Sequence, residues 1–299
     1  MFSTEFLLKG VAAPAATAFA ATLILSQLFA GRRAVAAVAF ALAQTLGWFL
    51  TLESTAAWIP TRNLHWTPWL AVLGSLVGPI VVASGLATLE RWLLAALATL
   101  GAAAFLVPNW PELWPSRPVS IAAVAFALAV IARGTDSVAR KQSPRLVSAS
   151  LSTTAIVAGA LIAASLSFRL GEAALVSAAA LGGVTAALWI VPSEEALRGL
   201  ALLYAIAVGG WCYVAAIEPP PPDPPIWGLM CLPATPLVLW LTAIGPVSRM
   251  KPAVRWAMSI AVVLAWLGGI GVWTWFATEQ APDEYSQARL CPTARCPMI

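Results

Sequence analysis

The residues best suited to chemistry follow the second apolar stretch of the chain. His65 is its only histidine, with Trp66 next to it and Glu53 upstream. A neutral imidazole can hydrogen-bond a quinone carbonyl, and a nearby carboxylate can receive a proton. His65, Glu53 and Trp66 are therefore candidate quinone-binding residues. The alternative is a simple contact between His65 and lipid headgroups, and the sequence indicates no catalytic residue.

Two of the four cysteines, Cys291 and Cys296, form the sequence Cys-Pro-Thr-Ala-Arg-Cys near the C-terminus. On an oxidising side of a membrane this spacing favours a small disulfide loop, and it differs from the Cys-x-x-Cys of redox pairs. Cys212 and Cys231 lie near the ends of two successive apolar stretches. They could approach each other there, or remain as buried free thiols.

Metal and haem chemistry is not expected. A single histidine and the lack of clustered ligand residues predict no metal site, and no haem held by two histidines of this chain. No cofactor is predicted, but a bound lipid, carotenoid or quinone is compatible with the sequence.

Tryptophan and proline are concentrated in alternate loops. Trp110-Pro-Glu-Leu-Trp114 places two indole rings around Glu112, and Trp227 follows a proline-rich loop. Tryptophan is enriched at binding hot spots and proline stiffens loops, so Trp110, Glu112, Trp114 and Trp227 are candidate partner-binding residues. The alternative is an ordinary aromatic belt at the membrane boundary. The tryptophans assigned to this outer side are Trp48, Trp58, Trp66, Trp69, Trp110, Trp114, Trp211, Trp227, Trp273 and Trp275.

These residues must be positioned by an all-α, polytopic bundle of membrane helices. The chain is 60% hydrophobic and 10% charged, which excludes a soluble globule, and its apolar stretches do not alternate with the period of strands. A membrane helix needs about 20 apolar residues. We predict ten spans, at 10–30, 34–52, 69–87, 92–107, 119–132, 146–168, 173–191, 199–217, 226–244 and 256–277.

The charges between these spans are sorted by side. Cations of short loops collect on the cytoplasmic side, so both termini are predicted to lie outside, in a bacterial inner membrane or its equivalent. The first span is expected to stay uncleaved, because its basic pair follows it. One set of alternate loops holds four of the 13 acids, Glu90, Asp136, Glu194 and Glu195, and eleven of the 17 cations, Arg32, Arg33, Arg91, Arg133, Arg140, Lys141, Arg145, Arg198, Arg249, Lys251 and Arg255.

The chain is interpreted as one membrane domain over 1–299, with a short external tail at 278–299. Five-helix halves at 1–132 and 146–277, joined by the basic loop 133–145, would suit an inverted repeat. Glycines in Gly74-Ser-Leu-Val-Gly78 and Gly268-Gly269-Ile270-Gly271 indicate close helix contacts, either within the chain or with a partner helix.

The function expected from these features is non-catalytic. We favour an accessory or scaffold subunit of a larger membrane complex, because ionisable groups are scarce inside the spans and ion-coupled transporters usually need them there. Its partners would be membrane lipids and other membrane subunits, and the basic loops give no reason to expect nucleic acid. A secondary transporter of an uncharged or amphipathic molecule, with a path lined by hydroxyls of 146–168, is the alternative. A quinone-binding anchor is the third.

Overall fold

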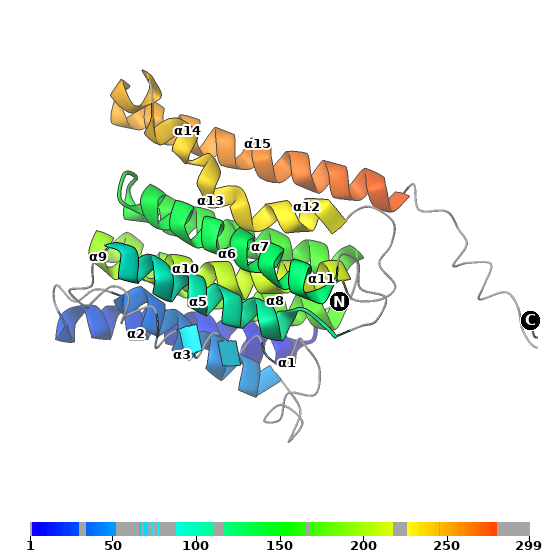
Figure 1. Ribbon diagram of the computed structural model, residues 1–299. Helices are drawn as coiled ribbons and strands as arrows, with labels where there is room; N and C mark the ends of the chain where they lie inside the picture. The colour runs from blue at the N-terminus through cyan, green and yellow to red at the C-terminus, as the bar shows by residue number, and fades with distance from the viewer. Residues whose placement is uncertain are drawn as a thin grey trace, which may run out of the picture.

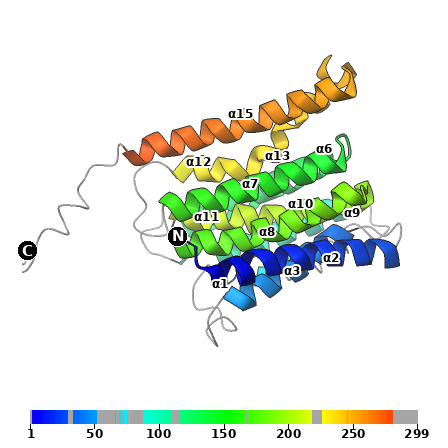
Figure 2. The same ribbon diagram turned by 180° about the vertical axis from the view of Figure 1, so that it is seen from behind.

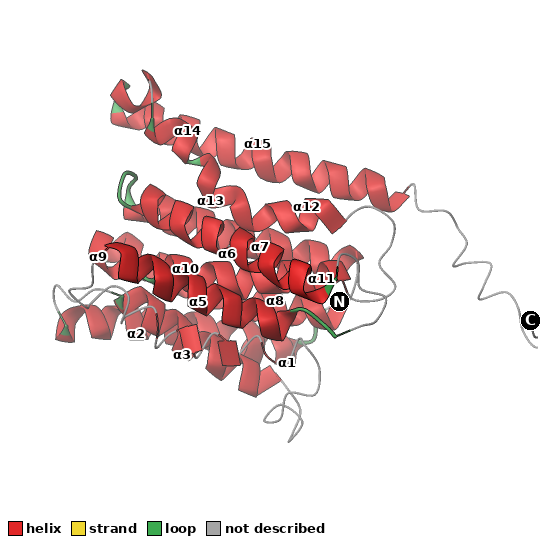
Figure 3. Cartoon of the chain, in the orientation of Figure 1, coloured by secondary structure: helices red, strands yellow, loops and turns green. Residues whose placement is uncertain are grey.

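The computed structural model describes residues 2–29, 34–51, 88–109, 116–165, 168–217, 226–244 and 246–279, and positions 66, 69–70, 73–74 and 77. Every regular element among these residues is a helix (Figure 3). The helices run back and forth along one common direction (Figure 1). Most of the predicted third span, 69–87, lies outside the described residues.

The first part of the chain forms long helices. The opening segment is continuous, and Ser3 caps it by accepting a hydrogen bond from Phe6 N at 3.0 Å. It comprises α1 (Thr4–Phe6), the π-helical η1 (Leu7–Ala12) and α2 (Ala13–Leu28). It is followed by α3 (Val35–Thr51), α5 (Thr88–Leu106), α6 (Arg117–Ala139), α7 (Pro144–Ser165) and α8 (Phe168–Ile190).

The second part contains interrupted helices. A first interrupted segment comprises α9 (Glu194–Leu197), α10 (Leu200–Tyr204), the π-helical η4 (Ala205–Gly209) and α11 (Gly210–Ile217). A second comprises α12 (Ile226–Cys231), the 3-10 turn η5 (Leu232–Ala234), α13 (Thr235–Val238) and α14 (Trp240–Ala243). The turn η6 (Pro246–Arg249) leads into the long helix α15 (Pro252–Glu279).

Six helical segments of the described residues are long and apolar enough to cross a membrane. This length and composition agree with the predicted class, a multi-pass helical membrane protein. The number of ten crossings stays a prediction. The six are Thr4–Leu28, Arg117–Ala139, Pro144–Ala164, Phe168–Ile190, Glu194–Ile217 and Pro252–Thr274, and shorter apolar helices are Val35–Thr51 and Gly228–Ala243.

The predicted break after residue 132 is wrong, because α6 continues to Ala139. Ion pairs along one face add a little stability to these turns: Asp136 Oδ2 lies 2.6 Å from Arg140 Nη2 and 3.5 Å from Arg133 Nη1. Charges three and four residues apart stabilise a helix in this way. The helix thus reaches a length that can cross a bilayer.

The predicted span 226–244 is interrupted instead of continuous. Pro233 and Pro236 lack an N–H, so the backbone leaves α-helical geometry around them. Pro236 cannot donate to the Leu232 carbonyl, which instead accepts from the backbone N–H of Thr235 and, at 2.6 Å, from the Thr235 hydroxyl. The Tyr204 hydroxyl donates to the Pro233 carbonyl at 3.1 Å. Hydroxyl groups of Thr235 and Tyr204 therefore donate to carbonyls that accept only from backbone N–H groups in a regular helix.

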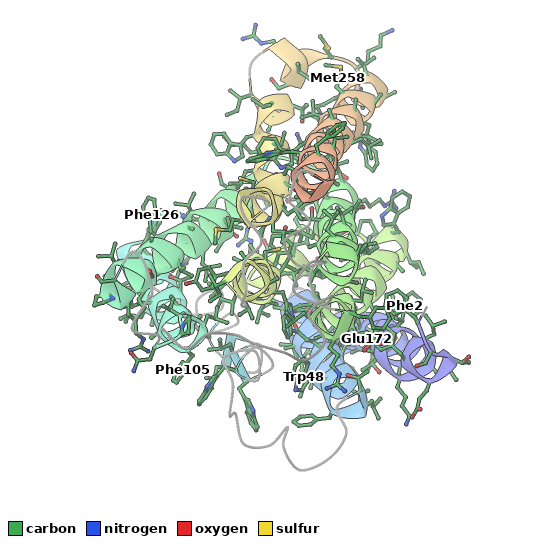
Figure 4. The ribbon with its side chains drawn as sticks, turned by 90° about the vertical axis from the view of Figure 1, so that its right-hand side faces the viewer. Phe2, Trp48, Phe105, Phe126, Glu172 and Met258 are labelled. Atoms are coloured by element: carbon green, nitrogen blue, oxygen red, sulfur yellow. The ribbon has the colours of Figure 1, made fainter. Side chains whose placement is uncertain are left out.

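The segment Glu194–Ile217 is the core of the bundle. Its apolar window is 94% buried, against 22–61% for the other five candidate spans. It contacts α3, α5, α6, α7 and α8, and η5 lies against its π-helical turn. Figure 4 looks along the helices and shows them grouped around this segment, with α15 at the periphery. A helix that is apolar on all sides is buried in this way.

Contacts bring the cation-rich loops together at one end of the bundle. Ala34 N donates to Glu195 O at 3.2 Å, Gln142 Nε2 donates to Thr242 Oγ1 at 3.1 Å, and Lys141 Nζ lies 4.6 Å from the Trp240 ring centroid. We call this the basic end. It is at the left in Figure 1, where α9, α14 and the turn between α6 and α7 meet.

The beginning of α1 and the last turns of α15 lie at the other end (Figures 1 and 2). There Phe2 stacks on Phe168, at the start of α8, with ring centroids 4.7 Å apart. The described loops are thus separated as the charge pattern predicted. The side of the membrane that each end faces stays a prediction.

Glycine allows a close helix approach between α2 and α8. A Cβ at Gly183 would collide with the carbonyl oxygen of Ala15, and Ala18 also lies against this position. Small residues allow such close backbone contact between membrane helices, where van der Waals packing replaces the hydrophobic effect as a source of association.

Replacing Gly183 by alanine should therefore lower the free energy of unfolding by about 1–3 kcal/mol, the usual cost of overpacking. Gly101→Ala in α5 is the control, because open space surrounds that position. There the higher helix propensity of alanine should stabilise the protein or leave it unchanged. Unfolding of both variants by SDS in mild detergent measures the difference, and equal effects would contradict the proposed contact.

Candidate partner-binding surface

Most of the predicted site residues lie outside the described part of the chain. Of Trp227 only the backbone, in α12, is described. Trp66 is described: it is half-buried and stacks on Phe105 of α5, with ring centroids 4.3 Å apart. The residues outside the described part are Glu53, His65, Trp110, Glu112, Trp114, Cys291 and Cys296.

Two tryptophans assigned to the outer surface belong to the core instead. Trp48 of α3 is 3% exposed and Trp211 of α11 is 2% exposed, and their rings form a tilted pair 5.5 Å apart. The indole Nε1–H of Trp211 donates to Ser177 Oγ of α8 at 3.2 Å. A buried indole needs such an acceptor. These rings join three helices and are not available to a partner.

Three of the described hydroxyls of α7 donate to carbonyls of their own helix. Ser148 donates to Arg145 O at 3.1 Å, Ser150 to Val147 O at 2.8 Å, and Thr154 to Ser150 O at 2.7 Å. Serine and threonine commonly satisfy themselves in this way on the preceding turn. Their geometry favours a packing role over a substrate path.

The other reactive groups considered for the spans are cysteine thiols and possible metal ligands. Cys212 is buried, Cys231 is half-buried, and both thiols are free. Among the described residues, no group of three or more His, Cys, Asp or Glu side chains is placed to hold a metal ion.

One candidate surface for a partner is a face of α15. Val263, Leu267 and Ile270 are buried against the bundle, on the side where α15 contacts α12, α13 and α7. On the opposite side Leu264 and Val272 are 59% and 56% exposed. Gly268 lies between them, four residues from each, which places all three along one line of the helix.

Within the described part of the chain, the glycines of this helix face open space. A Cβ at Gly268, Gly269 or Gly271 would meet nothing within 4 Å. Of the two readings of this motif, the described residues provide no close contact within the chain at these glycines, and contact with a partner helix stays a prediction. We call the surface formed by Leu264, Gly268, Gly269, Gly271 and Val272 the α15 glycine face. Exposed Trp273 and Phe276 continue it toward the end opposite the basic end.

The fold and this surface define a class: a helical, multi-pass membrane protein whose described interior is largely filled by helix packing. Compared with known proteins, the chain matches no protein-family model and no curated protein. Function therefore has to be inferred from the molecule itself.

The hydrogen bond between Trp211 and Ser177 provides a test of the core. Ser177→Ala leaves the indole N–H unpaired and should lower the free energy of unfolding by about 1–2 kcal/mol. In a double-mutant cycle with Trp211→Phe, the second substitution should cost less in the Ser177→Ala background, because the bond is already lost. Additive effects in the SDS unfolding assay would show that this bond does not form.

Proposed function

We propose that the protein is a non-catalytic accessory subunit of a membrane complex, and that the α15 glycine face holds an apolar transmembrane helix of another subunit. The supporting observation is the open space above Gly268, Gly269 and Gly271. The proline- and tryptophan-rich loops were predicted to bind a partner at the outer end of the bundle. A partner helix on the α15 glycine face would enlarge that predicted binding surface.

The cost of glycine supports a helix as the occupant. In a helix interior glycine is about 1 kcal/mol less favourable than alanine. At Gly183 that cost is offset by close contact with α2, but at the three glycines of α15 the described chain offers no such contact. Lipid chains adapt to any side chain, whereas a second helix gains contact area when its backbone can approach a glycine.

The shape of the face is also suited to a helix. Leu264 and Val272 project on either side of Gly268, so they bound a notch one residue wide along the helix. A side chain of a neighbouring helix could enter this notch, as knobs enter holes in packed helices. Acids and bases are missing from positions 256–278 of α15, so the expected partner is apolar there.

The two other functions stay alternatives. A transporter would need a polar path, and three of the hydroxyls of α7 that were expected to line it, those of Ser148, Ser150 and Thr154, bond their own helix. A quinone-binding anchor depends on His65 and Glu53, which lie outside the described residues, and on Trp66, which stacks on Phe105.

Site-specific crosslinking tests the partner helix. With p-benzoylphenylalanine at Val272, illumination of native membranes should give one discrete heavier product, identified by mass spectrometry as a second membrane subunit. The same probe at Phe126 of α6, which is 72% exposed and apolar, is the matched control and should give lipid adducts only. Gly268→Leu should abolish the product by filling the notch. Lipid adducts alone at Val272, or a product of two copies of this chain, would overturn the proposal.

The proposed orientation has a separate test. Lys141 at the basic end is exposed, and so is Glu5 at the other end, so single cysteines can be placed at each in a cysteine-free background. With the basic end in the cytoplasm, a membrane-impermeant maleimide should label the Glu5→Cys variant in intact cells. The Lys141→Cys variant should react only after the membrane is permeabilised. The reverse labelling pattern would invert the topology.

A further inference from the structure

A cavity of about 80 Å³ lies at the basic end, where α5, α6 and α10 meet. Four arginines line it: Arg91 from the first turn of α5, Arg133 near the end of α6, Arg140 at the C-cap of α6, and Arg198 just before α10. Residues from three distant parts of the chain thus bring four positive charges to one place.

Beside its four arginines, the cavity is lined by a single described acid. Asp136, the acid that lines the cavity, pairs with Arg140 at 2.6 Å and more weakly with Arg133 at 3.5 Å. Arg198 pairs with Glu195 at 2.8 Å. Each guanidinium has five N–H donors, so these contacts leave many donors available for an anion. The pairs are partly exposed and contribute little stability by themselves.

One arginine is held in place by a contact that leaves its donors available. The Arg133 guanidinium lies over the Trp92 ring, 4.6 Å from its centroid, a stacked arrangement that keeps the N–H groups at the edge of the plane. Arg91 Nε, like the Nε atoms of Arg117, Arg145 and Arg255, is shielded from solvent and has no hydrogen-bond acceptor within the described part of the chain. A buried donor of this kind is satisfied when an acceptor binds.

The backbone conformation before α10 places Arg198 at the cavity. Gly199 has φ 85°, a left-handed conformation that glycine adopts without a steric penalty. This residue separates the extended backbone at Arg198 from the start of α10, and both residues line the cavity. A residue with a side chain at position 199 would strain this turn.

The wall of the cavity changes from charged to apolar within one helical turn. Ala95 follows Arg91 by four residues in α5, and Ala129 precedes Arg133 by four residues in α6, so both lie one turn further into the bundle. Ala96, Ala132 and Leu202 complete this wall. Cations at the end of a membrane bundle with alkyl side chains just beneath them match a ligand that has an anionic head and a hydrocarbon body.

We infer that this arginine-lined cavity binds the phosphate group of an anionic phospholipid, with the first part of an acyl chain against the alanine wall. Basic pockets between membrane helices are suited to such headgroups, and guanidinium groups bind phosphate oxygens in a two-pronged manner. The inference goes beyond the accessory role and does not depend on a partner at the α15 glycine face.

Native mass spectrometry of the full-length protein, titrated with phosphatidylglycerol or phosphatidylcholine, tests the inference. The first phosphatidylglycerol should bind at least about tenfold more tightly than phosphatidylcholine. The Arg91→Gln/Arg133→Gln variant should lose most of that preference, since each cation near a lipid surface adds several-fold in affinity. Arg91→Lys should retain part of it. Arg255→Gln is the matched control, because Arg255 belongs to the same end but does not line the cavity.

Three results would overturn the inference: equal affinity for the two lipids, an unchanged preference in the doubly substituted protein, or equal loss in Arg255→Gln. Inorganic phosphate in the same titration separates the lipid from a free anion. It should not compete at millimolar concentration, and full competition would assign the cavity to a soluble phosphate. The SDS unfolding assay checks that the substituted proteins are folded, and Arg91→Gln alone serves if the double variant is not.

Discussion

The membrane interior offers no water, so each backbone N–H and C=O must be satisfied within its helix or by a neighbouring side chain. This constraint explains why the described interior is built from helices and why so little polar chemistry remains in it. The hydrophobic effect contributes little between helices in lipid, and association depends on close contact. The apolar window of the segment Glu194–Ile217 is 94% buried, and Gly183 shows how closely two helix backbones approach elsewhere.

The class of fold and the separation of charges could be predicted from the sequence because both follow from the cost of burying charge. Arginine and aspartate cannot lie at mid-depth without partners, so their positions mark the ends of helices. The described contacts accordingly join Ala34 to Glu195 and Gln142 to Thr242 at the basic end. The ends of individual helices were less predictable. The charged residues after position 132 suggested that the helix ends there, but the ion pairs around Asp136 are compatible with α6 continuing to Ala139.

Other features depend on three-dimensional neighbours that no local pattern contains. An indole at a membrane boundary and one in the core have the same sequence context, so the burial of Trp48 and Trp211 was missed. The arginine-lined cavity was also missed, because Arg91, Arg133 and Arg198 belong to different loops. The signal that could have suggested it is their shared side in the charge pattern, combined with the alanines one turn away from Arg91 and Arg133.

The interrupted segment Ile226–Ala243 has a consequence for how the protein is made. Tyr204 and Gln142, which donate hydrogen bonds to it, precede it in the chain, whereas Ser259 of α15, which shares a hydrogen bond with Thr242, follows it. A ribosome therefore delivers Tyr204 and Gln142 to the membrane before this segment emerges, and the contact with Ser259 forms last. The order of the chain thus favours an order of insertion, in which the irregular segment enters the bilayer after the earlier helices that donate hydrogen bonds to it.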